Sequence, residues 1–130
     1  MVGDGALTWF ERLVSSKSRK VHRLDDGRLL GIAGKMKDCL GLIAWLNGSA
    51  PRPKKLAVSA LLVSCDGRVE LIVDDADPVE IEVPAAVGSG SELAIGAMLA
   101  GASPMEAVQI ACSRDPFSGG QLIEEKLHAR

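Results

Sequence analysis

The chain has 130 residues, 47% of them hydrophobic, and its 15 basic and 17 acidic side chains leave a net charge of −2. This length and apolar content suit one folded domain over residues 1–130 with a core of its own. The balanced charge excludes the basic excess typical of proteins that bind nucleic acid or anionic membranes, and no apolar run is long enough to span a bilayer.

Cysteine and histidine usage argues against a disulfide framework or a zinc site. The three cysteines are far apart and odd in number, and two histidines are too few for a metal centre. These residues are Cys39, Cys65, Cys112, His22 and His128. We expect buried reduced thiols, no cofactor and no metal. A polar Gly3-Asp4-Gly5 stands where a secretory signal would be basic and then apolar, so we expect a cytoplasmic protein.

The first half of the chain predicts a hairpin. Residues 1–18 show no regular pattern, and we expect an irregular segment there. Alternation over 20–24, the turn signal Asp25-Asp26-Gly27 and the apolar stretch 28–33 predict two antiparallel strands.

A helix and further strands follow. Apolar residues recur at helical spacing over 35–46, which predicts a helix. The stretches 56–65 and 68–73 flank an Asp66-Gly67 turn and predict a second hairpin, and 80–83 alternates like another strand.

Two helix-start patterns mark the last third of the chain. Ser89-Gly90-Ser91-Glu92 has the spacing of a capping box, which predicts a helix over 93–100. Ser103-Pro104-Met105-Glu106 has the same spacing, with proline at the first helical position, and predicts a helix to about residue 112. Residues 121–127 have room for a short strand or helix. Hairpins interleaved with helices favour a layered α/β fold.

Five short motifs stand in a distinctive order. They are Gly3-Asp4-Gly5, Arg19-Lys20-Val21, Gly31-Ile32-Ala33-Gly34, Gly88-Ser89-Gly90 and the run 114–120 of sequence Arg-Asp-Pro-Phe-Ser-Gly-Gly. Each alone has a simpler explanation: a Gly-Asp-Gly is commonly a turn, a lysine on a strand is commonly solvated, and a serine before a helix is commonly a cap.

Taken together, and with Asp4 and Lys20 sixteen positions apart, the motifs resemble the proteasome β-subunit and HslV family of N-terminal-nucleophile hydrolases over nearly the whole chain. The run 114–120 is more similar to the proteasome β type than to HslV. The resemblance implies an α+β fold, a four-layer αββα sandwich of antiparallel sheets that is N-terminally shortened here. It also implies a threonine-type peptidase subunit acting on peptides or unfolded proteins, a homo-oligomer (dimer or ring), and an ATP-dependent unfoldase as a further partner.

The resemblance assigns roles to particular residues. Lys20 matches the lysine whose ammonium favours the alkoxide of the nucleophile, and Asp4 matches the carboxylate that pairs with it. The backbone N–H of Gly31 matches the donor to the developing oxyanion. Ser89 matches the serine near the catalytic α-amine.

Asp115 and Ser118 match the remaining polar network of the family's site. One departure concerns the substrate pocket, because Lys35 stands where an acidic or small residue is common in relatives.

The nucleophile of this family is a Thr hydroxyl that self-processing exposes as the first residue, with its own α-amine as general base. The family places it well ahead of the position matched by Asp4, where this sequence offers no Thr, Ser or Cys, and cutting at Thr8 or Ser15 would discard Asp4. We therefore expect the chain as written to be inactive. It is either a shortened form of a longer gene product or a non-catalytic relative that keeps the fold for assembly or binding.

An unrelated α/β ligand-binding domain with coincidental motifs is a third hypothesis. It predicts that Asp4, Lys20 and Ser89 lie far apart in space.

Overall fold

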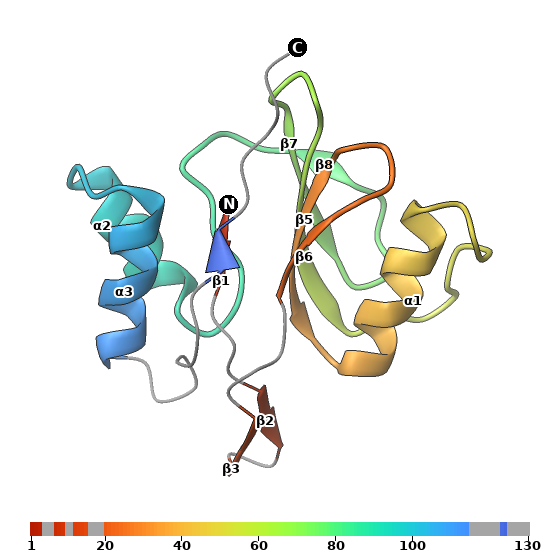
Figure 1. The fold of residues 1–130 in the computed structure, drawn as a ribbon, viewed down its shortest axis with the longest axis horizontal. Coiled ribbons are helices and arrows are strands. Elements are labelled where there is room, and N and C mark those ends of the chain that lie inside the picture. The colour runs from red at the N-terminus through yellow and green to blue at the C-terminus, as the bar shows by residue number, and fades with distance from the viewer. Residues whose placement is uncertain (4–6, 10–11, 16–19, 115–122, 125–130) are drawn as a thin grey trace.

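A five-stranded antiparallel sheet forms the centre of the fold (Figure 1). The computed structural model describes residues 1–3, 7–9, 12–15, 20–114 and 123–124. The strands lie side by side in chain order: β4 (Val21–Arg23), β5 (Leu29–Gly34), β6 (Val58–Val63), β7 (Val69–Val73) and β8 (Val79–Glu80). Both predicted hairpins are confirmed. The strand predicted over 80–83 is present only at its start, because the ladder closes with the N–H of Ile81 on the carbonyl of Val69.

The turns that join β4 to β5 and β6 to β7 are built in the same way. The carboxylate of Asp26 accepts the backbone N–H of Arg28 at 3.1 Å and its Nε at 2.7 Å. Asp66 and Arg68 repeat this pair of hydrogen bonds at 3.0 and 2.9 Å. The glycine between each pair has a φ of 91° or 90°, which a residue with a side chain rarely adopts. The short Asp-Gly-Arg sequence therefore encodes each turn locally.

Helix α1 (Met36–Leu46) covers one face of the sheet and confirms the predicted helix. Alternate residues of β5, among them Leu30 and Ile32, pack under it with Leu42 of the helix and Ile72 of β7. Leu30 and Leu42 are 0% exposed. The core on this side is therefore formed by large aliphatic side chains.

Helices α2 (Ser91–Leu99) and α3 (Pro104–Arg114) lie on the other side of the sheet (Figure 1). The capping box of α3 is confirmed: the Ser103 hydroxyl accepts the N–H of Glu106 at 3.2 Å, and the Glu106 carboxylate accepts the N–H of Ser103 at 3.0 Å. The helix runs two residues beyond the predicted end at Cys112.

The capping box predicted at Ser89 is wrong. Gly90, not Ser89, occupies the N-cap position of α2. The physical reason is a turn ahead of the helix, in which Gly88 has a φ of 102° and its carbonyl accepts the N–H of Ser91 at 3.1 Å. This turn moves the start of the helix past Ser89 and places Ser89 in the connecting loop.

The prediction of an irregular segment over 1–18 is also wrong, because the backbone there forms three short strands. β1 (Val2–Gly3) pairs with β9 (Ile123–Glu124), and β2 (Leu7–Trp9) pairs with β3 (Arg12–Ser15). These strands are too short for alternation to show in the sequence. In Figure 1, β1 lies between the five-stranded sheet and the pair α2–α3, so the layers run helix, sheet, sheet, helix. Within the described residues, no helix has the length and apolar character needed to cross a membrane.

We expect Leu42→Ala to lower the free energy of unfolding by about 2–5 kcal/mol, because it leaves a cavity under α1. Urea unfolding followed by circular dichroism measures the change. Leu40→Ala is the matched control, since Leu40 is on the same helix but 61% exposed. An equal loss in both variants would contradict the assigned face of α1.

The two turn carboxylates predict a pH dependence of stability. Hydrogen bonds from the backbone N–H, and then the side chain, of the arginine two residues on hold the pKa of Asp26 and of Asp66 below the ordinary 3.8. A lowered folded-state pKa contributes stability above the unfolded value, and this stability is lost as the pH falls through the folded pKa.

The double variant Asp26→Asn/Asp66→Asn should therefore be less stable than the wild type at neutral pH, with the gap closing as the pH falls below the unfolded pKa of about 3.9. Urea midpoints measured across this range test the prediction. If the difference in urea midpoint between the variant and the wild type stays constant with pH, the loss of stability comes from side-chain geometry and not from the carboxylate charge.

Candidate active site

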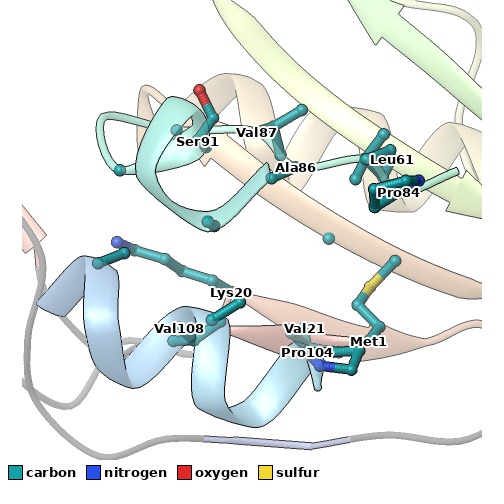
Figure 2. A pocket seen from close by; sticks show the side chains of 18 of the residues that line it. Met1, Lys20, Val21, Leu61, Pro84, Ala86, Val87, Ser91, Pro104 and Val108 are labelled. Carbon is teal, nitrogen blue, oxygen red and sulfur yellow. The ribbon is translucent and has the colours of Figure 1, made fainter. Parts of the chain in front are cut away.

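A cavity of about 780 Å³ lies between the sheet and helices α2 and α3 (Figure 2). Its walls are the face of β5 and β6 that α1 does not cover, the loop over 83–90, and the inner sides of the two helices. This volume lies within the range of small-molecule and peptide pockets. The cavity therefore has room for a ligand of several residues, not for one side chain alone.

Lys20 is the residue just before β4, at the edge of this cavity. Its carbonyl accepts the N–H of Ile32 at 2.9 Å, which fixes the backbone of Lys20 against β5. Its half-buried side chain lines the cavity and enters it in Figure 2. Among the described lining residues, Lys20 is the only one with a charged side chain.

Gly31 lies in the middle of β5, opposite Val21 on one side and Leu61 on the other. It is buried and lines the cavity. A Cβ at this position would come within 2.9 Å of the Met1 sulfur, so a side chain here would have to displace Met1 and would narrow the cavity. Because Gly31 has no side chain, this part of the cavity stays open.

The backbone N–H of Gly31 points away from β4. Successive N–H groups of a strand point to opposite neighbours, and the N–H of Ile32 points to Lys20 of the β4 segment. The N–H of Gly31 therefore faces β6, inside the ladder. By the same alternation the N–H of Gly34, at the end of β5, faces the β4 side, and no described residue is paired with it there.

Ser89 lies in the loop between Gly88 and Gly90 and lines the same cavity. This loop passes close to β5, since a Cβ on Gly88 would lie 3.5 Å from the Cβ of Ala33. The loop therefore brings Ser89, from the sequence just before α2, to the edge of the cavity that the sheet forms.

Of the six predicted site residues, three come together here: Lys20, Gly31 and Ser89 line one cavity from three separate segments. Asp4, Asp115 and Ser118 lie outside the described residues. The hypothesis of coincidental motifs requires Lys20 and Ser89 to be far apart, whereas both line this one cavity.

The structure holds no disulfide among the three cysteines, and each is partly rather than fully buried, where we expected buried thiols. Burial, with Asp38 adding to it, raises the pKa of Cys39 to about 11, while the Lys20 charge acts in the opposite direction. Cys39 packs against the core and stays a thiol at neutral pH. Cys112 lines the cavity, a position that its sequence context does not reveal.

Sequence reasoning also missed the alanine-rich part of the cavity wall. The alanines that line it are Ala33, Ala85, Ala86, Ala94, Ala102, Ala107 and Ala111. The signal that was available is the alanine content of the two helix segments, 91–99 and 104–114.

No family model matches the sequence, and no curated protein matches it. Solved structures do match. HslV from Trypanosoma brucei superposes with a TM-score of 0.74 at 22% identity, covering 94% of this chain and 88% of that chain. BPH from Thiobacillus denitrificans gives 0.72 at 18% identity, and its complex with epoxomicin gives 0.69 at 16% identity, with the same two coverages.

These comparisons and the layer order confirm the expected fold. The chain is an α+β protein with the fold of HslV and of the proteasome-β-like N-terminal-nucleophile hydrolases.

Proposed function

We propose that this chain is a proteasome-β/HslV-like subunit of a threonine-type peptidase and that the cavity binds the peptide beside the bond to be cleaved. One observation carries the proposal: Lys20, Gly31 and Ser89, which the family resemblance groups in one site, line a single ligand-sized cavity. The HslV-like fold supports it.

In this proposal the Lys20 ammonium stabilises the alkoxide of a Thr nucleophile as it attacks the peptide carbonyl. Asp4 pairs with Lys20, and Ser89, Asp115 and Ser118 hold the α-amine and the polar network around it. A lysine half-buried in an apolar cavity acts more strongly on a nearby anion than a solvated one, because water screens it less.

The strand register of β5 limits which backbone N–H can be the oxyanion donor. The resemblance assigns the N–H of Gly31, but a peptide reaches that N–H only if its place in the β5–β6 ladder opens. The N–H of Gly34 faces the open side of β5 and is the second candidate for this role.

Exposed apolar side chains support the further proposal that the subunit acts as a homo-oligomer. Leu99 at the end of α2 is 71% exposed and Leu40 on α1 is 61% exposed. Buried contacts between subunits would remove this apolar surface from water. A cytoplasmic location and delivery of unfolded protein by an ATP-dependent unfoldase belong to the same proposal.

Two expressed forms test the peptidase. The first is the chain as written, and the second carries the codons upstream of Met1 as far as the nearest in-frame Thr. We expect the second to cleave fluorogenic peptides, and epoxomicin, which is bound in one of the BPH structures, to inhibit it. Mass spectrometry of the mature N-terminus identifies the nucleophile.

In the active form, Lys20→Ala should lower kcat/KM by about a hundredfold or more, because the alkoxide and the oxyanion lose their nearest cation. Lys37→Ala, an exposed lysine on α1, is the matched control and should change little. If neither form cleaves any peptide, the chain is a structural or assembly subunit and the peptidase proposal is wrong.

Native mass spectrometry tests the oligomer. We expect Leu99→Glu to shift the assembly toward smaller species, because a carboxylate is costly to bury in a contact between subunits. Lys54→Glu introduces the same side chain at another exposed site and should leave the assembly intact. A wild-type protein that is monomeric at micromolar concentration would overturn this part of the proposal.

A further inference from the structure

The first turn of α1 holds the peptide backbone at Ala57, the residue just before β6, through two hydrogen bonds. The carbonyl of Ala57 accepts the N–H of Lys35, the N-cap residue of α1, at 3.1 Å. The N–H of Ala57 donates to Oδ2 of Asp38, in the first turn of the helix, at 2.9 Å. Both backbone polar groups of Ala57 are therefore bound to one turn of α1.

Asp38 makes a connection that a capping box does not make. In a capping box, an acidic side chain at the third helical position accepts the N–H of the N-cap residue. Here the N–H of Lys35 donates to Ala57, and Asp38 accepts the N–H of Ala57. A carboxylate acceptor makes such a bond stronger than a neutral one does, and Asp38 is half-buried. Asp38 thus joins the helix to the start of β6.

The backbone of Ala57 is packed against Gly34 at the end of β5. Gly34 has a φ of 139°, a conformation that residues with a side chain rarely adopt. A Cβ on Gly34 would clash with the carbonyl oxygen of Ala57 and would lie 2.8 Å from the Cα of Val58. The next N–H along the chain, that of Lys35, is bound to the same carbonyl. Ala57 therefore sets the orientation of the backbone at Gly34.

A second carboxylate holds the next residue of this segment from the end of β7. Oδ1 of Asp74 accepts the N–H of Val58 at 3.2 Å, and the N–H of Asp74 donates to the carbonyl of Val58 at 2.8 Å. Asp74 has a φ of 52°, in the left-handed region that aspartate adopts more readily than most residues. The start of β6 is thus held from α1 and from β7, and it provides a fixed support for Gly34.

Resting on the proposed peptidase function, in which the N–H of Gly34 is a candidate oxyanion donor, we propose that Asp38 is a positioning residue. It acts through Ala57 and not on the substrate. Its carboxylate fixes Ala57, and Ala57 keeps Gly34 in the conformation that directs its N–H to the β4 side. An oxyanion donor acts on charge that develops in the transition state, so a displaced donor lowers the rate more than it weakens substrate binding.

Nuclear magnetic resonance on the chain as written tests the backbone part of this proposal without any cleavage. In Asp38→Ala we expect the amide of Lys35 to exchange with solvent about tenfold faster, because Ala57 has lost its anchor. The coupling constant that reports φ of Gly34 should change as well. The amide of Ile32, which is bound on the β4 side, should keep its protection. Asp38→Asn keeps an acceptor oxygen and should restore most of the wild-type behaviour.

Kinetics of the extended, active form test the catalytic part. Asp38→Ala should lower kcat by about tenfold or more and change KM by less than about twofold, and Asp38→Asn should recover most of kcat. Asp26→Ala is the matched control, since Asp26 also accepts a backbone N–H, at 3.1 Å, but in the turn at the other end of β5. This control should leave kcat unchanged. Circular dichroism checks that each variant is folded at the assay temperature.

An unchanged exchange rate of Lys35 in Asp38→Ala would overturn the assignment, since Ala57 would then be held without Asp38. Faster exchange with an unchanged kcat, or a rise in KM alone, would overturn the catalytic role. If no expressed form cleaves peptide, the peptidase proposal and this catalytic role are both wrong. The exchange experiment still decides whether Asp38 holds the backbone, so the two failures are distinguishable.

Discussion

Strand β5 has to be buried on both faces, and the layered structure follows from that constraint. Its sequence is apolar throughout, so neither face of the strand can be left in water without cost. Leu30 and Ile32 meet α1 on one side, while Leu29 and Gly31 face the cavity on the other. One face is filled by large side chains and the other is left hollow, and the hollow face is where Lys20 and Ser89 converge.

The two helix layers differ because their contact residues differ in size. Leucine, isoleucine and tryptophan side chains fill the space between α1 and the sheet, whereas α2 and α3 pack on each other through alanines. Large buried side chains stabilise a layer through the apolar area that they remove from water, and alanine contributes much less. The sheet and α1 therefore bury more large apolar side chains than the alanine-rich pair α2–α3 does.

What the sequence predicts well is what depends on neighbouring residues. The Asp-Gly-Arg turns and the Ser103 capping box are complete within three or four positions, and the structure confirms them. β1 is different, because its partner is near the other end of the chain: Val2 pairs with Glu124. The prediction of Ser89 as an N-cap was wrong for a related reason. The start of α2 is set by the turn at Gly88, which packs against Ala33 of β5. The family resemblance supplied the grouping of Lys20, Gly31 and Ser89, which no local pattern contains.

The register of β5 also decides which side of the strand each of its backbone N–H groups faces. The N–H of Ile32 donates to the carbonyl of Lys20, on the β4 side. Because N–H groups alternate along a strand, the even-numbered residues of β5 direct theirs to the β4 side and the odd-numbered residues direct theirs to β6. Gly31 thus contributes an open surface to the cavity, whereas Gly34 directs its N–H to the β4 side, where no described residue is paired with it. Gly34 cannot accept a side chain, because a Cβ there would clash with the carbonyl of Ala57. A glycine required by the backbone and an N–H directed to the β4 side of the strand therefore coincide at one residue.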